Sequence, residues 1–184
     1  MPSASLNPPL PEREPPSGRH GTGVHVSEAP VGSALLRLLR AHAQLGTALL
    51  ARIGVPPPQE LVLLRLEELG TLPQGDLVRY LNRDRSTTSA TLQAMERAGL
   101  ITRSPSRSDR RALDVSITDA GRALCPAVRD AWAELEETAF SHLSSDDRAA
   151  LIAAMDASQQ ALAVTLEERS HDRASVPSDG RRQQ

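Results

Sequence analysis

One short polar segment, DRSTTSATLQAMER at residues 84–97, carries the most distinctive hydrogen-bonding chemistry of the sequence. Within it, Thr88, Leu92 and Met95 recur at intervals of four and three, which predicts a helix with one buried face. The opposite face combines a guanidinium group, several hydroxyls and an amide. Such groups bind phosphate oxygens and the base edges that nucleic acids expose in their grooves. The predicted members of this contact face are Arg85, Ser86, Thr87, Ser89, Ala90 and Gln93.

The ends of this helix are also marked in the sequence. Ser86 is expected to be the N-cap, because its hydroxyl can accept hydrogen bonds from the first turn, and Gly99 suits the positive φ that often follows a helix. A second periodic segment, PQGDLVRYLN at residues 73–82, predicts another short helix upstream. A tight turn at residues 83–85 joins the two. Two helices joined in this way form a helix-turn-helix, whose second helix enters the major groove of DNA.

A hairpin is predicted directly after the polar helix. Residues 100–103 form its first arm, and residues 104–111, SPSRSDRR, form a polar tip. Leu113, Val115 and Ile117 then alternate with polar residues, which predicts a strand with one buried face. A hairpin in this position beside a helix-turn-helix is a wing.

Positive charge is concentrated in this part of the chain. The whole sequence has a net charge of −2, and all 21 of its basic residues are arginines. Residues 71–117 hold eight arginines and five acidic residues, a net of +3, so the remainder has a net charge of −5. A basic module in an acidic chain indicates a groove-binding element on a scaffold that does not bind nucleic acid. The tip arginines expected to enter the minor groove are Arg107, Arg110 and Arg111.

Residues 58–124 resemble the core of MarR-type winged-helix regulators. The shared motifs are Gln59 before an apolar helix, DRST at 84–87, MERAGLI at 95–101, Asp109-Arg110-Arg111 in the tip and ITDAG at 117–121. The resemblance implies a homodimeric DNA-binding regulator in which Asp109 pairs with Arg111 and stiffens the wing. Ala90 stands where many members of the family have an arginine. More of the base reading is therefore expected from Gln93, from threonine methyl groups and from DNA shape.

The predicted fold class is mainly α with a small β wing, in which a winged helix-turn-helix module is flanked by dimerisation helices. The module is expected at residues 57–117, and Leu61, Leu64 and Leu66 are expected to supply the apolar surface of its first helix. A short strand at residues 71–72 would extend the sheet of the wing.

Long apolar stripes flank the module on both sides. Thr118 is expected to cap a helix that runs to about His142, and Ser144 or Ser145 is expected to cap a last helix. These helices have too little core of their own, so a second copy of the chain is expected to cover them and to supply two-fold symmetry. The ranges are 1–29 for a disordered tail, 30–54 for the first dimerisation helix, 118–169 for the C-terminal dimerisation helices and 170–184 for a second disordered tail.

The remaining composition indicates a soluble cytoplasmic protein. The single cysteine, Cys125, excludes an intramolecular disulfide and fits a reducing compartment. The sequence shows no secretory signal pattern and no apolar run of membrane-spanning length, so no membrane partner is expected. Its five histidines are scattered, and nucleophile and phosphate-loop motifs are missing, so neither a metal, a cofactor nor an enzymatic activity is expected.

A small-molecule effector would bind in the crevice where the module meets the dimerisation helices, and the family resemblance implies the same place. The residues expected to line this crevice are His42, Leu45, Leu61, Arg65 and Trp132.

The sequence thus predicts a sequence-specific regulator that binds double-stranded DNA, a repressor that meets a pseudo-palindromic operator as a homodimer. Two alternatives stay open. One is a redox-responsive regulator that senses through Cys125, although the chain has no second cysteine to react with an oxidised thiol. The other is a protein-interaction module that shares the fold without binding DNA.

Overall fold

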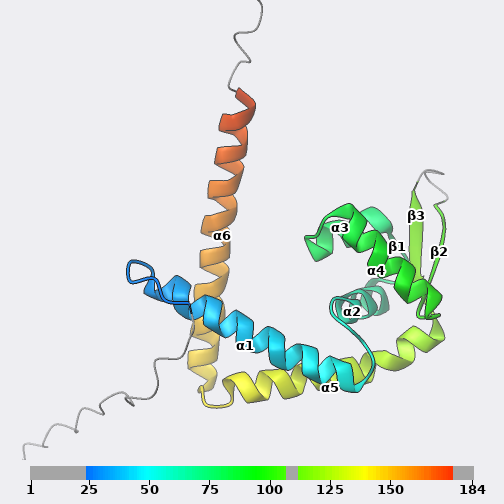
Figure 1. The fold of residues 1–184 in the computed structure, drawn as a ribbon, viewed down its shortest axis with the longest axis horizontal. Coiled ribbons are helices and arrows are strands. Elements are labelled where there is room, and N and C mark those ends of the chain that lie inside the picture. The colour runs from blue at the N-terminus through cyan, green and yellow to red at the C-terminus, as the bar shows by residue number, and fades with distance from the viewer. Residues whose placement is uncertain (1–23, 107–111, 176–184) are drawn as a thin grey trace, which may run out of the picture. The chain divides into compact units, whose positions relative to one another are not determined.

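The computed structural model of the chain describes residues 24–106 and 112–175. It forms two compact units, residues 1–43 and residues 44–184. Figure 1 shows the order of the elements, in which helix α1 (Pro30–Arg52) passes from the first unit into the second. Residues 107–111 of the expected wing tip, most of the expected N-terminal tail and the end of the C-terminal tail lie outside the described residues.

The described part of the first unit, residues 24–43, is a turn folded onto the start of α1. Ser33 is 2% exposed, and its hydroxyl accepts a hydrogen bond from the Val26 amide at 2.9 Å. The Arg37 guanidinium donates to the Val24 carbonyl at 3.0 Å. These bonds order residues 24–29, a segment that was expected to be disordered. The apolar stripe of α1 is open to solvent in the single chain at Val31, Leu35, Leu36, Leu38 and Leu39.

In the second unit, α2 (Gln59–Leu69) supplies the centre of the hydrophobic core. Val62, Leu63 and Leu66 are fully buried there, and α2 contacts α4, α5 and the sheet. Of the three leucines expected to supply apolar surface, Leu66 is fully buried, Leu64 is half-buried and packs against the core, and Leu61 is half-buried. The run LVLLRL is apolar at almost every position, so its sequence does not reveal which side turns inward.

Helices α3 (Gln74–Leu81) and α4 (Arg85–Arg97) form the predicted helix-turn-helix. The turn begins at Asn82, whose backbone is left-handed with φ 47°, a conformation that asparagine adopts more readily than most residues. The predicted inner face of α4 is confirmed, since Thr88, Leu92 and Met95 are all fully buried. The helix ends in the predicted way, because Gly99 has φ 71° and its amide bonds to the Glu96 carbonyl.

The sheet has three antiparallel strands in the order β1-β3-β2. Strand β1 (Leu72–Pro73) pairs with β3 (Leu113–Ile117), which also pairs with β2 (Ile101–Pro105) to form the predicted wing. In β3, Val115 is fully buried and Ile117 half-buried, but Leu113 is 36% exposed. The expectation that Leu113 is buried is therefore wrong, because this end of the strand extends beyond the core.

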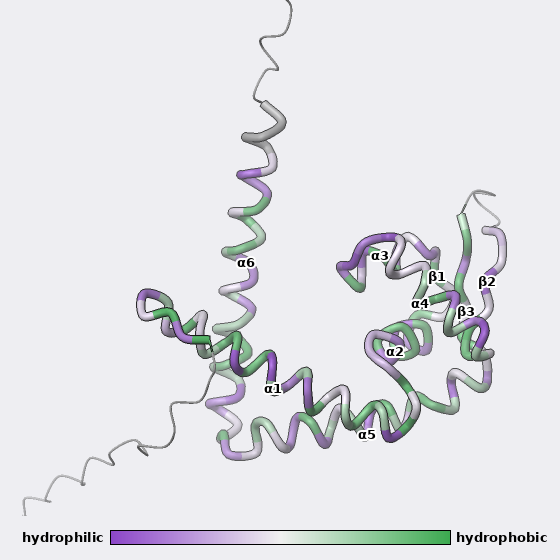
Figure 2. The backbone as a smooth tube through the Cα atoms, in the orientation of Figure 1, coloured by the Kyte–Doolittle hydropathy of each residue, from purple (hydrophilic) through white to green (hydrophobic). Residues whose placement is uncertain are grey.

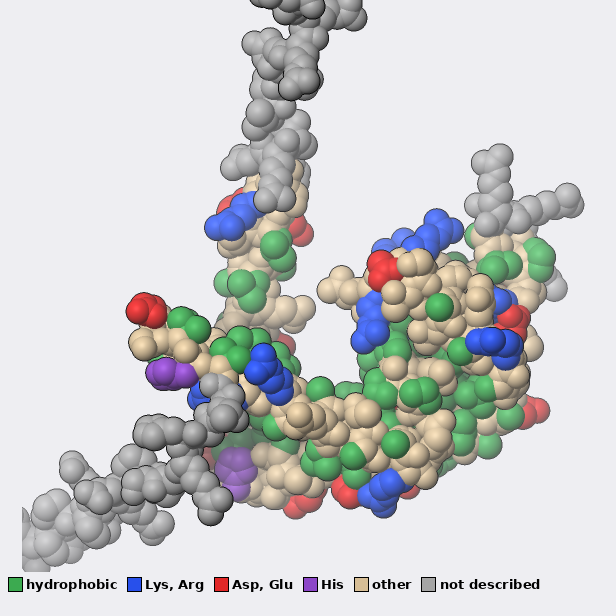
Figure 3. Space-filling model, in the orientation of Figure 1, with side chains coloured by type: hydrophobic (Ala, Val, Ile, Leu, Met, Phe, Trp, Pro, Cys, Tyr) green, Lys and Arg blue, Asp and Glu red, His purple; other side chains and the backbone are tan. Residues whose placement is uncertain are grey.

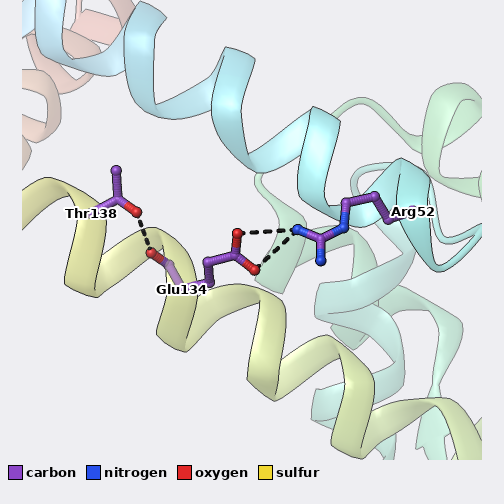
Figure 4. A network of polar contacts seen from close by, with 3 residues as sticks. All are labelled: Arg52, Glu134 and Thr138. Carbon is purple, nitrogen blue, oxygen red and sulfur yellow. Dashed lines mark hydrogen bonds and ion pairs between the residues drawn. The ribbon is translucent and has the colours of Figure 1, made fainter.

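Helix α5 (Asp119–Phe140) begins at the predicted cap, since the Thr118 hydroxyl accepts a hydrogen bond from the Gly121 amide at 3.1 Å. The helix continues through Pro126. In the second half of α5, Glu134 forms an exposed ion pair at 3.1 Å with Arg52, the last residue of α1 (Figure 4).

Helix α6 (Ser145–Ser175) begins after Ser144, whose hydroxyl accepts from the Asp147 amide at 3.2 Å. It runs past the expected end at residue 169. Hydrophobic and hydrophilic residues alternate along it (Figure 2), and Leu162 and Leu166 are exposed in the single chain. The prediction that no apolar run approaches membrane-spanning length is wrong, since an 18-residue window within residues 145–170 has a mean hydropathy of 1.3, which is long and apolar enough to cross a membrane by length and composition only. A helix that packs against a partner chain has a similar composition, so this test alone does not indicate a membrane.

Gly121 offers a test of how tightly α5 packs against the start of the wing. A Cβ atom at Gly121 would overlap the Leu100 carbonyl oxygen, which is backbone and cannot move away easily. We expect Gly121→Ala to lower the free energy of unfolding by about 1–3 kcal/mol in urea titrations, although alanine normally favours a helix. The matched control is Gly75→Ala in α3, where nothing lies within 4 Å and a gain of up to about 1 kcal/mol is expected. Equal effects of the two substitutions would contradict the close packing.

Candidate nucleic-acid interface

The predicted contact face of α4 points away from the core. Because Thr88, Leu92 and Met95 are held in the core, the other side of the helix must face outward. Of the predicted contact residues in α4, only Ser89 is half-buried. The exposed ones are Arg85, Ser86, Thr87, Ala90 and Gln93.

The first turn of α4 is capped by Asp84, and the prediction of Ser86 as the N-cap is wrong. Asp84 has the extended backbone of a cap residue, and its Oδ1 accepts from the Thr87 amide at 2.8 Å. The Ser86 hydroxyl, already inside the helix, donates to the same oxygen at 2.6 Å. Hydrogen bonds from Ser86 and Thr87 hold the pKa of Asp84 well below its usual range. The cap therefore stays ionised and orients the Ser86 side chain.

Basic side chains surround the two helices (Figure 3). Arg79 in α3 pairs with Asp76 at 2.6 Å, and Arg85 opens α4. Both arginines line a cavity of about 540 Å³ between α3, the start of α4 and the start of β3. Its other lining residues are Pro73, Gln74, Gly75, Val78, Ala112 and Leu113. Two guanidinium groups at one cavity suit an anionic group such as a phosphate.

The wing is described up to its tip. The Ser106 amide donates to the Ala112 carbonyl at 2.9 Å, which continues the hairpin beyond its paired strands. In the middle of β2, Arg103 donates two hydrogen bonds to Glu96 in α4. Sequence reasoning missed this interaction. The predicted tip residues Arg107, Asp109, Arg110 and Arg111 lie outside the described residues.

The residues predicted to line an effector crevice have separate surroundings. The Arg65 guanidinium lies 4.9 Å from the centre of the Tyr80 ring and donates to Glu68 at 3.3 Å. Tyr80 was not among the predicted residues, although it lies within the first helix of the helix-turn-helix. His42 belongs to the first unit, whereas Leu45, Leu61, Arg65 and Trp132 belong to the second.

A cavity of about 170 Å³ lies between the end of α1 and α5, within the second unit. It is lined by Leu49, Arg52, Ile53, Ala127, Asp130, Ala131 and Glu134. None of the predicted effector residues is among them. The Arg52–Glu134 pair lies at this cavity, so its charges are already matched to each other.

Cys125 has the surroundings of a packing residue. Its side chain is fully buried, and its sulfur lies 3.7 Å from the Gly121 carbonyl oxygen. Burial, together with the nearby Glu67 carboxylate, raises the pKa of the Cys125 thiol to about 11. Because the thiolate is the reactive form, these surroundings disfavour oxidation of Cys125.

Comparison with known proteins identifies relatives of the segment that contains the helix-turn-helix. Residues 55–113 match the model of the MarR family. A Bacillus subtilis (strain 168) protein, the organic hydroperoxide resistance transcriptional regulator, is 38% identical over 76 residues, 41% of this chain. The match spans about half, 52%, of that relative's length.

Two solved structures share the fold over most of their length. A probable transcriptional regulator from Pseudomonas aeruginosa has 29% identity and a TM-score of 0.63, over 70% of this chain and 96% of its own. The transcriptional repressor CouR, solved bound to a 23-mer DNA duplex, has 28% identity and a TM-score of 0.62, over 71% of this chain and 92% of its own. Residues 55–113, which hold the helix-turn-helix, therefore match the MarR family, and this chain is similar to the transcriptional regulators named above.

Proposed function

We propose that this chain is a sequence-specific DNA-binding repressor that acts as a homodimer. The observation that carries the proposal is the outward polar face of α4, which the Asp84 cap and the buried Thr88, Leu92 and Met95 hold beside the wing. A face of this kind suits the major groove, and the wing beside it suits the adjoining minor groove. The related repressor CouR, which was solved bound to a 23-mer DNA duplex, supports a DNA-binding role for this chain.

Within this docking mode, the exposed residues take different roles. Gln93 can form a two-pronged pair with adenine, and the methyl group of Thr87 can contact the methyl group of thymine. Arg85 and Ser86, at the start of α4, are placed for phosphate contacts, which fix register without reading sequence. In the wing tip, which lies outside the described residues, we assign minor-groove contacts to Arg107, Arg110 and Arg111.

A homodimer would cover the apolar side chains that a single chain leaves in water. Val31, Leu35 and Leu39 in α1 are between 47% and 80% exposed, and Leu162 and Leu166 in α6 are 66% and 65% exposed. Exposed apolar faces of this length are typical of protein–protein contacts. Two-fold symmetry would place two α4 helices on half-sites roughly 34–36 Å apart, which explains a pseudo-palindromic operator.

Regulation by a small molecule belongs to the same proposal. We place its site among the predicted residues of the second unit, Leu45, Leu61, Arg65 and Trp132, where the Tyr80 ring beside Arg65 adds an aromatic surface. A carboxylate ligand at Arg65 would have to displace or share the Glu68 contact. Such an effector changes DNA binding only if its affinity differs between the free and DNA-bound forms. We place the protein in the cytoplasm, where such an operator would lie.

A redox-responsive regulator is the second candidate, favoured by the similarity to a regulator of organic hydroperoxide resistance. The burial of Cys125 and its raised thiol pKa oppose it. Peroxide that releases DNA from the parent chain but not from Cys125→Ser would support this candidate.

Selection of genomic DNA fragments by the purified chain tests the proposed function directly. Fragments retained at low salt are sequenced, and enrichment of a two-fold-related motif is the expected result. Retention of no fragment would instead favour the alternative of a protein-interaction module without DNA binding.

Gln93→Ala should separate base reading from simple attachment to DNA. If Gln93 pairs with a base, the variant should lose about 1–3 kcal/mol of binding free energy on the selected operator and little on random duplex. Titration of labelled DNA at fixed salt measures both. Gln160→Ala, the same truncation on the exposed surface of α6, is the control and should change neither. Equal losses of Gln93→Ala on operator and random DNA would show that Gln93 reads no base.

Leu162→Asp should prevent self-association if α6 packs against a partner chain. Leu151, Met155, Leu162 and Leu166 lie on one side of the helix at 100° per residue, and Gln160 lies on the opposite side. A carboxylate at position 162 would be buried in the dimer without a partner, which costs several kcal/mol, whereas one at position 160 would stay in water. Sedimentation equilibrium should therefore give monomer for Leu162→Asp and dimer for Gln160→Asp. A dimeric Leu162→Asp chain would contradict the use of this face.

A further inference from the structure

The Glu96–Arg103 ion pair joins the last turn of α4 to the middle of β2. Arg103 donates from Nε at 3.0 Å and from Nη2 at 2.6 Å, both to the same Glu96 oxygen. The Arg103 side chain is 15% exposed and that of Glu96 is 38% exposed, so the pair is partly shielded from water. The hydrogen bonds from Arg103 lower the pKa of Glu96, which keeps the pair charged at neutral pH.

The other ion pairs of the described residues connect different parts of the molecule. Arg65–Glu68 and Arg79–Asp76 each lie within one helix, at a spacing of three residues. Arg52–Glu134 links α1 to α5, and Arg129–Glu67 links α5 to α2. Among the described ion pairs, only Glu96–Arg103 bridges the proposed reading helix and the wing.

Both ends of the bridge sit on backbone that is already fixed. On the helix side, the Gly99 amide bonds to the Glu96 carbonyl and the Leu100 amide bonds to the Met95 carbonyl, which closes the end of α4. On the wing side, Arg103 is paired in register with Val115 of β3, which is fully buried. A side-chain bridge between two such anchors restricts the angle between α4 and the hairpin.

We infer that Glu96 and Arg103 are positioning residues that hold the wing at the angle needed for α4 and the wing to contact one DNA duplex together. This inference rests on the proposed DNA-binding function. Neither residue needs to touch DNA in this role. Arg103 already directs two donors at Glu96 and is mostly buried, so it is a poorer phosphate ligand than the exposed Arg85.

Simple electrostatics predicts the opposite effect from positioning, which makes the inference testable. Removing the Glu96 carboxylate raises the net charge by one and releases the Arg103 guanidinium, so attraction to phosphates should increase. Loss of positioning should instead weaken binding, because the wing would no longer meet the DNA in register with α4. The sign of the change therefore separates the two explanations.

The experiment compares the full-length parent chain with Glu96→Ala and with Glu68→Ala as the matched control. Both variants remove a carboxylate from an ion pair with arginine in the same module, but the Arg65–Glu68 pair lies within α2 alone. Affinity for the selected operator is measured over a range of salt concentrations, at a temperature where circular dichroism shows every variant folded. A third chain, Glu96→Arg with Arg103→Glu, reverses the pair and restores the parent's net charge.

We expect Glu96→Ala to bind the operator about tenfold more weakly, the size of one charge-assisted hydrogen bond. The slope of log affinity against log salt should also become shallower by about 0.9 for each phosphate that the displaced wing no longer neutralises, although no phosphate-binding residue was removed. Glu68→Ala should keep the parent slope, and the reversed pair should recover most of the parent's affinity and slope.

Binding by Glu96→Ala that equals or exceeds that of Glu68→Ala, with an unchanged slope, would overturn the positioning role. A reversed pair that binds as poorly as Glu96→Ala would overturn it as well. A parent chain that retains no DNA fragment would overturn the proposed function and this inference together, whereas the first two results would leave the proposed function intact.

Discussion

The carbonyl group of Leu100 is the point at which the reading helix, the wing and α5 are joined. It accepts a hydrogen bond from the Thr118 amide at 3.1 Å, and the Thr118 hydroxyl donates to the Gly99 carbonyl at 2.7 Å. The same hydroxyl caps α5 through the Gly121 amide, and Gly121 lies so close to Leu100 that a side chain there would collide. The end of α4, both ends of the wing and the start of α5 therefore share one small set of backbone contacts. A glycine at 121 and a hydroxyl at 118 are the residue types that this joint requires.

This joint explains how a chain with so few aromatic side chains can present a defined surface to DNA. Helix α4 is fixed at its start by the Asp84 cap, at its end by the Gly99 turn and along its length by Leu92 and Met95. The Glu96–Arg103 pair adds a side-chain bridge from the helix to the wing. Because α5 begins at the joint and also contacts α2, a movement of α5 would be passed to the surface proposed to read DNA. A regulator built in this way needs no large rearrangement to lose register with its operator.

Much of this architecture could be predicted from local sequence patterns. Intervals of three and four identified the buried face of α4, alternation identified β3, and Gly99 and Thr118 were identified as helix-end residues. Sequence patterns failed where more than one residue could fill the same structural role. Ser86 and Asp84 are both good caps, and only the extended backbone at Asp84 decides between them. The Glu96–Arg103 bridge and the stacking of Arg65 on Tyr80 depend on how separate elements pack, which periodicity does not encode.

The central claim is that two copies of α4 enter the major groove of one duplex. Methylation by dimethyl sulfate tests it, because the reagent attacks guanine N7, which lies in the major groove. On an operator selected by the parent chain, bound protein should protect two groups of guanines centred about one helical turn, roughly 34–36 Å, apart and related by two-fold symmetry. Substituting Gln93 with alanine should leave the spacing of the two groups unchanged. Bound protein that protects no guanine N7, or only one group of them, would contradict the claim.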